Sequence, residues 1–295
     1  MSWFQINHET LYQYSEPVRF AEHRLVLRPR EGHDIRVEEM RLTISPEFSI
    51  EWSRDVFGNS VATVHLLEKA DELLIRSECV IHQTADFPVE ERPHAAPLPY
   101  PVIYDDRESI VASAYRTTTF PDDLKTVRSW VKNIDLPPEA TADAVVDTIN
   151  RAIRTGIRYN RRDERGVQSP SETLSLGTGS CRDLSTLLLE ALRVLGFPAR
   201  FASGYLDCRA SEAGRASTHA WAEAYLPEIG WLGVDPTIGE RTSTRHVVVG
   251  VSNHPRGVMP IKGSFYGKRE KYLGMTVAVQ TERLQEPPLM VGDLE

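Results

Sequence analysis

The sequence predicts a two-domain α+β protein, with an N-terminal antiparallel β domain and a core in which a cysteine-bearing helix packs on an antiparallel sheet. Three observations support this class. As far as residue 85, short apolar stretches recur about every 8–12 residues, which is typical of antiparallel sandwiches and half-barrels. From Pro121 the apolar residues follow a helical period, and later segments alternate as strands do. The 295 residues suffice for two hydrophobic cores.

The first domain is assigned to residues 1–115, as a β-sandwich-like unit followed by a proline-rich connector. Phe57-Gly-Asn59 predicts a turn between two of its strands. Six prolines between residues 86 and 121 exclude long regular elements there, so we expect this segment to wrap the surface. Strands are expected at short apolar or alternating stretches, namely residues 3–14, 18–27, 37–44, 61–68 and 72–82.

The second domain is assigned to residues 116–295, as a core with further strands at its C-terminal end. Residues 158–179 are polar and irregular, so no regular element is expected there. Helical spacing of apolar residues predicts three helices, at residues 122–134, 139–157 and 181–195. Alternation predicts strands at residues 199–206, 219–226, 230–236, 245–251 and 272–282.

Charge and composition exclude several functions. The net charge is −8, from 34 basic and 42 acidic residues, and no basic block stands out, which argues against nucleic-acid binding. No stretch approaches the ~18 apolar residues of a membrane span, and the N-terminus lacks the pattern of a signal peptide. We therefore expect a cytoplasmic protein with neither a nucleic-acid nor a membrane partner. Motifs that bind zinc, calcium or nucleotide phosphates are absent from the sequence, so we expect no metal and no cofactor.

One of the three cysteines, Cys181, stands at a predicted helix start. Ser180-Cys-Arg-Asp183 fits a capping box, which makes Ser180 the N-cap, Cys181 the first helical residue and Asp183 a cap. Backbone N–H groups at a helix start favour thiolate and can hold an oxyanion on an attacked carbonyl. The alternative is a buried, inert cysteine. Cys79 and Cys208 are interpreted as inert, and their wide spacing argues against disulfides and a zinc ribbon.

A nucleophilic cysteine needs a base and a group that orients the base. Alternation in HAWAEAYL puts His219 and Trp221 on one strand face, and a row of alanines that can press on a helix on the other. The short PEIG connection favours a hairpin in which Asp235 pairs with His219 or Trp221, within reach of the imidazole. Taken singly, each residue is better explained structurally, but together with Cys181 they fit a thiol acyl-transfer enzyme. The other eight histidines are interpreted as structural or exposed.

Several motifs resemble a known family. In the second half they are Gly179-x-Cys-Arg-Asp183, Leu195-Gly-Phe-Pro-Ala-Arg200, Ser203-Gly-Tyr-Leu206, His219-Ala-Trp221 and Asp235-Pro-Thr237. In the first half they are His8-x-Thr-x-Tyr12, Pro17-Val18, Leu27-Arg-Pro29 and Asp55-x-Phe-Gly-Asn59. Both sets resemble the bacterial transglutaminase-like family of the papain-like thiol superfamily. The resemblance implies a transglutaminase-like core after the family's β domain, with Cys181 as nucleophile, His219 as general base and acid, and Asp235 as the orienting carboxylate.

The expected activity is hydrolysis of peptide or side-chain amides in a peptide or protein substrate, through a thioester on Cys181. Two alternatives stay open: transamidation of glutamine side chains, and peptide binding without turnover. One segment departs from the family pattern, because Val251-Ser-Asn253 stands where Arg-Asp-Tyr is common. A substrate-binding or bracing role is therefore not carried over to that segment.

Overall fold

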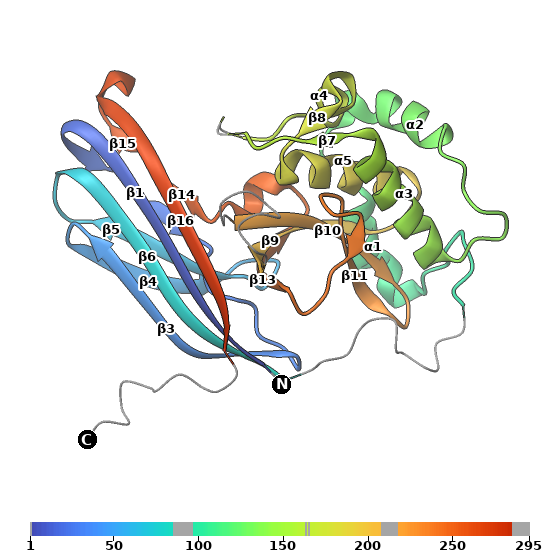
Figure 1. Ribbon diagram of the computed structural model, residues 1–295, viewed down its shortest axis with the longest axis horizontal. Helices are drawn as coiled ribbons and strands as arrows, with labels where there is room; N and C mark the ends of the chain where they lie inside the picture. Colours follow the sequence, from blue (N-terminus) through green and yellow to red (C-terminus); the bar gives the residue numbers. More distant parts are fainter. Residues whose placement is uncertain (1, 85–96, 163, 165, 208–217, 285–295) are drawn as a thin grey trace.

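The computed structural model describes residues 2–84, 97–162, 164, 166–207 and 218–284. Figure 1 shows a β domain beside an α+β domain. The strands of the β domain are β1 Ser2–Phe20, β2 His23–Leu25, β3 Ile35–Ser45, β4 Phe48–Arg54, β5 Ser60–Leu66, β6 Ala70–Gln83, β14 Ile261–Lys262, β15 Phe265–Tyr266 and β16 Tyr272–Leu284. They form two antiparallel sheets, β15-β1-β6-β3 with β16 also on β1, and β14-β2-β5-β4.

The two sheets pack face to face, because apolar side chains alternate along their strands and need a common interior. The buried cluster between the sheets is drawn from β1, the β2 segment, β3, β5 and β6, and comprises Tyr14, Val18, Phe20, Leu25, Leu27, Ile44, Ala62, Val64, Leu73 and Ile75. The predicted antiparallel β domain is confirmed.

The C-terminal strands lie in the β domain, whereas the predicted boundary placed them with the core of residues 116–295. In Figure 1 the red-orange β16 runs along the blue β1, and the pairing extends from Trp3↔Leu284 to Tyr14↔Tyr272. Without β16, β1 would be a 19-residue edge strand with a row of unpaired backbone groups. The C-terminal end of the chain returns to the β domain because β16 covers that edge. No local pattern in the sequence indicates this pairing.

The α+β domain contains the remaining elements. Its helices are α1 Asp106–Arg116, α2 Leu124–Lys132, α3 Ala142–Gly156, α4 Pro170–Leu176 and α5 Cys181–Val194, with 3₁₀ turns η2 Pro121–Asp123 and η3 Pro255–Val258, whereas the 3₁₀ turn η4 Arg269–Lys271 joins β15 to β16 in the β domain. Its strands are β7 Arg158–Tyr159, β8 Thr178–Gly179, β9 Ala199–Leu206, β10 Thr218–Leu226, β11 Gly230–Asp235, β12 Glu240–Arg241 and β13 His246–Ser252. The main sheet has the order β12-β11-β10-β9-β13.

Two helices were not expected from the sequence. Helix α1 lies in the proline-rich connector, between Pro101 and Pro121, where 19 residues contain no proline. Helix α4 lies in the segment expected to be irregular, and begins with a complete capping box between Ser169 and Glu172. Both helices are short and present few apolar residues, so their hydrophobic period is weak. The capping signals at their N-termini were the available indication.

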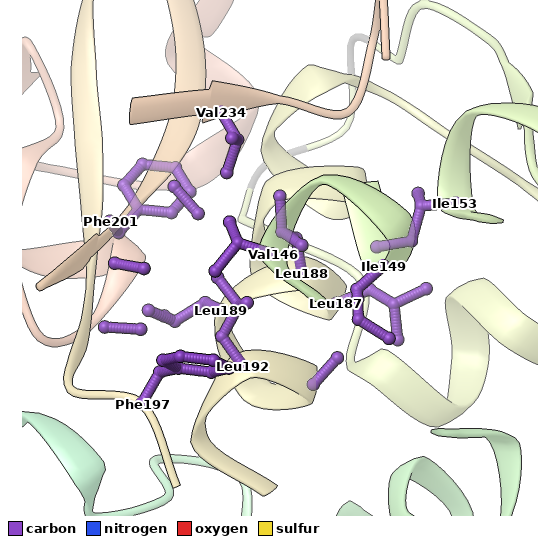
Figure 2. Close-up of a cluster of buried hydrophobic side chains, with 14 of the residues drawn as sticks. Val146, Ile149, Ile153, Leu187, Leu188, Leu189, Leu192, Phe197, Phe201 and Val234 are labelled. Atoms are coloured by element: carbon purple, nitrogen blue, oxygen red, sulfur yellow. The ribbon is translucent and has the colours of Figure 1, made fainter. Parts of the chain in front are cut away.

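Helix α5 is the centre of the second core. Leu184, Leu187, Leu188 and Leu192 are all fully buried, and Figure 2 shows that α3 side chains such as Ile149 surround α5 together with side chains of the sheet. The β10 face that meets α5 consists of Ala220, Ala222 and Ala224, as the alternation predicted. Small side chains on that face let the helix approach the sheet closely, which fixes the position of its N-terminus.

The two domains share a third buried cluster. It joins β1, β3, β6 and β16 to β9 and β13 through Phe4, Ile6, Ile35, Cys79, Ile81, Tyr205, Val247, Val249 and Val279. The Asn59 side chain also pairs with the backbone of Val251, donating to its carbonyl at 2.8 Å and accepting from its N–H at 2.9 Å. The segment 251–253, which departs from the family pattern, is thus held at Val251 through its backbone. This contact does not depend on Arg-Asp-Tyr side chains.

Replacing Leu188 with Ala should lower the free energy of unfolding by ~2–5 kcal/mol, because a fully buried leucine leaves a cavity beside α3 and the sheet. Replacing Cys181 with Ala should cost only about 1 kcal/mol, because it removes one atom at the helix end. Urea denaturation of both variants tests this. Equal destabilisation by the two changes would make Cys181 an ordinary core residue.

His8 should make the fold sensitive to acid. Burial lowers the pKa of His8 to about 4, while Tyr205 and Thr10 engage its two ring nitrogens at 3.0 and 3.2 Å. The unfolded chain binds the proton first, so this stabilisation is complete above pH 6.5 and disappears as the pH falls toward 4. Between pH 7.5 and 5 the loss is about 2 kcal/mol.

Urea denaturation at both pH values should show that His8→Gln, which keeps polar partners without titrating, loses less stability in acid than the unaltered chain. An equal loss in both proteins would show that His8 does not carry the effect.

Candidate active site

Cys181 is the first residue of α5, as the capping pattern predicted. Ser180 is the N-cap, and the Asp183 carboxylate accepts hydrogen bonds from the Ser180 backbone N–H and hydroxyl, both at 2.8 Å. Asp183 also accepts from the Gln168 backbone N–H at 2.7 Å. Gly179 is required before this turn, because a Cβ there would lie 2.8 Å from the Asp183 side chain. Asp183 is therefore a cap, and the start of α5 is held rigidly.

His219 and Asp235 are brought together by the β10–β11 hairpin. The paired residues run from Leu226↔Gly230 to Ala222↔Val234. If this register is extended by one residue, Asp235 lies opposite Trp221 and is the diagonal neighbour of His219. His219 Nε2 and Asp235 Oδ2 are 2.7 Å apart. The predicted hairpin and its even register are confirmed.

The Asp235 carboxylate is fully buried and saturated with donors. Its Oδ1 accepts the Thr237 backbone N–H at 2.8 Å, while Oδ2 contacts His219 and, at 3.3 Å, Nε2 of His246. Burial alone would raise the pKa of Asp235, but the two histidines outweigh burial and hold that pKa well below its usual range. Asp235 is therefore an anion at neutral pH.

His219 responds to the same charge. Burial alone would lower its pKa, but the Asp235 carboxylate, the hydrogen bond to it and the Cys181 side chain together raise the pKa of His219 to about 10. Nε2 is occupied by Asp235, so we assign Nδ1 to the thiol. Cys181, His219 and Asp235 thus meet in one buried site, with 9%, 6% and 0% of their surfaces exposed. Exposure decreases from Cys181 through His219 to Asp235, so the carboxylate is the most deeply buried of the three groups.

His246 is the site residue that the sequence interpretation missed. It was grouped with the structural or exposed histidines, but it is buried beside Asp235 and its ring packs edge-on against Trp221, with centroids 5.2 Å apart. No spacing rule could find it, because β13 is separated from β10 by β9. The available signal was the position of His246 near the start of the strand predicted at residues 245–251.

The other residues of interest lie elsewhere. Cys79 is buried between the domains, and burial raises its pKa to about 12, which agrees with the prediction that it is inert. Cys208 lies outside the described residues. Within the described part of the chain, no group of three or more His, Cys, Asp or Glu side chains is arranged to hold a metal ion. Helices long and apolar enough to cross a membrane are likewise not found among the residues described.

A cysteine at a helix start, facing a histidine and an aspartate on neighbouring antiparallel strands, defines the class of transglutaminase-like thiol proteins. Residues 128–236 match the family model of the transglutaminase-like superfamily, and residues 4–82 match that of the bacterial transglutaminase-like N-terminal region. The chain therefore belongs to the transglutaminase-like superfamily and carries the N-terminal region of its bacterial members.

Two relatives and one solved structure are similar to this chain. An uncharacterized protein of Mycobacterium tuberculosis strain H37Rv is 27% identical over 292 residues, which cover 90% of this chain and 88% of the relative. A protein-glutamine gamma-glutamyltransferase of Pseudomonas aeruginosa is 38% identical over 66 residues, only 20% of this chain and 10% of that protein. The crystal structure of a proposed cysteine protease from Cytophaga hutchinsonii superposes with a TM-score of 0.70 at 15% identity, covering 98% of this chain and 92% of that one. This last likeness confirms the fold.

Cys181 should be alkylated by iodoacetamide faster than Cys79 near neutral pH. Cys181 has the His219 imidazolium and a helix N-terminus beside it, whereas burial raises the pKa of Cys79 to about 12. Peptide mapping after brief labelling measures the order, and also shows where Cys208 falls. Preferential labelling of either other cysteine would contradict the assignment of Cys181 as the reactive thiol.

Proposed function

We propose that the protein hydrolyses peptide or side-chain amides, with Cys181 as nucleophile, His219 as general acid and base, and Asp235 as the orienting carboxylate. The observation that carries the proposal is the buried 2.7 Å contact between His219 and Asp235. This contact raises the pKa of His219 and orients its ring, and it leaves Nδ1 for the Cys181 thiol at the start of α5.

The reaction would begin with a thiolate–imidazolium pair. The raised pKa of His219 favours imidazolium at neutral pH, and the nearby helix N-terminus favours the thiolate. The Cys181 sulfur attacks the amide carbonyl carbon, and the carbonyl oxygen becomes an oxyanion that backbone N–H groups at the helix start can stabilise. The raised pKa of His219 thus supplies a proton donor beside Cys181 before substrate binds.

The second half of the cycle releases the products. The His219 imidazolium donates its proton to the leaving amine nitrogen as the C–N bond breaks, which leaves a thioester on Cys181 and a neutral imidazole. The imidazole then takes a proton from water while the water oxygen attacks the thioester carbon. The C–S bond breaks, the carboxylic acid leaves, and Asp235 keeps the ring oriented through both proton transfers.

Transamidation uses the same thioester with an amine in place of water. The short match to the Pseudomonas gamma-glutamyltransferase falls in this class of chemistry, but it covers too little of the chain to assign the acceptor. We favour hydrolysis, because water needs no binding site of its own, whereas an amine acceptor needs one that leads to Cys181. We retain the proposals of a cytoplasmic location and of a peptide or protein substrate, with no nucleic acid or membrane as partner.

The test is mass analysis of a peptide library incubated with the protein, with and without a primary amine. Cleaved or deamidated peptides in both samples are expected. Cys181→Ala should abolish the activity, and Asp235→Asn should reduce the rate by on the order of 10⁴-fold while substrate binding persists. Asp105→Asn is the matched control, because it makes the same change at the exposed N-cap of α1. Incorporation of the amine would instead show a transferase, and unchanged peptides would favour the binding module.

A further inference from the structure

We infer that His246 is a positioning residue for the proposed reaction: it holds the Asp235 carboxylate in the orientation that fixes the His219 ring. This inference rests on the proposed function and extends it to a fourth side chain, which does not contact the reacting sulfur. The first observation is that both histidines meet one oxygen, Oδ2, with His219 Nε2 at 2.7 Å and His246 Nε2 at 3.3 Å.

The tautomer of His246 is defined by its other contact. The Ser243 backbone N–H donates to His246 Nδ1 at 3.1 Å, so Nδ1 is an acceptor and the proton lies on Nε2. Nε2–H therefore donates to Asp235. With Thr237 donating to Oδ1, the carboxylate is held at both oxygens, and it cannot rotate about its last bond without losing a donor in a site with no exposed surface.

The path of the chain shows how His246 reaches this place. Residues 242–245 lead from the β12 edge of the main sheet to its β13 edge. At the start, the Thr242 N–H donates to the Gly233 carbonyl of β11, and at the end the Arg245 carbonyl accepts from the N–H of Asp207, which follows β9. His246 is the first residue after this crossing. The Gln83 side chain of the β domain donates to the Thr244 carbonyl at 2.9 Å and secures the crossing from outside.

The His246 ring is also fixed by packing. The Trp221 ring meets it edge-on and lies over Gly204, where an added Cβ would be only 2.8 Å from the indole. The Trp221 indole N–H faces Glu223 at 3.4 Å, at the other end of the ring system. A ring held by one neighbour, one backbone donor and one carboxylate has a single arrangement, which is what a positioning residue requires.

The titratable groups that face His219 are Asp235 from β11, Cys181 from α5 and His246 from β13. Loss of the His246 donor leaves Oδ2 with His219 as its one remaining donor from the two histidines, so the carboxylate is held less firmly and orients the imidazolium beside Cys181 less well. The readout is therefore the rate of Cys181 alkylation as a function of pH, which needs no substrate and no turnover.

The experiment compares His246→Leu, His246→Gln and His246→Asn with the unaltered chain, and uses His23→Leu, a buried histidine of the β domain, as control. A glutamine amide nitrogen reaches the place of Nε2, whereas an asparagine amide reaches only that of Nδ1. We expect the Leu and Asn variants to move the half-maximal alkylation rate upward by at least one pH unit and to lower kcat/KM about 10–100-fold. The Gln and His23→Leu variants should keep the unaltered profile.

An unaltered alkylation profile in folded His246→Leu would overturn this inference alone. If that variant does not fold, the Gln and Asn pair decides, because equal profiles in the two would show that the donor at Nε2 has no role. An ordinary thiol rate for Cys181 in the unaltered chain would instead overturn the proposed function, and this inference with it.

Discussion

Asp235 sets the conditions for the whole site, because its carboxylate is ionised and has no exposed surface. An ionised carboxylate buried without donors is unstable by several kcal/mol, and a protein must either supply donors or let the group take a proton. Here the donors come from the turn after β11, from β10 and from β13, through Thr237, His219 and His246. One buried charge thereby fixes the relative positions of three separate parts of the sheet, and the imidazole that faces Cys181 takes its orientation from them.

The β domain takes part in this arrangement. It bonds to the crossing before β13 through Gln83 and to β13 itself through Asn59, and it shares a buried apolar cluster with Val247 and Val249 of β13. The strand that carries His246 is thus the edge strand of the main sheet, and it packs against the β domain. Two regions that match separate family models therefore form one structural unit, and the β domain contributes to the rigidity of a site to which it lends no reacting group.

Local physics made much of this predictable from the sequence. The capping box placed Cys181 at the start of α5, and strand alternation with a short connection gave the register that joins His219 to Asp235. Features that depend on distant pairing left no local trace. The partner of β16 lies some 270 residues earlier in the chain, at β1, and His246 reaches Asp235 only because the chain crosses the sheet. Helix α1 was missed for a different reason, since the proline content of its surroundings concealed a proline-free interval.

Two buried histidines show why burial alone does not decide protonation. His8 and His219 have similar exposure, at 2% and 6%, yet the pKa of His8 falls to about 4 and that of His219 rises to about 10. The ring nitrogens of His8 contact hydroxyl groups, which do not offset the free-energy cost of burying a charged imidazolium. His219 contacts a carboxylate, whose negative charge does offset that cost. By linkage, the contribution of His8 to stability is lost as the pH falls below 6.5, and that of His219 is lost as the pH rises from 6.5 through 10. The two contributions are therefore both nearly complete only around pH 6.5, so the interface between the domains and the charged site favour the same near-neutral range.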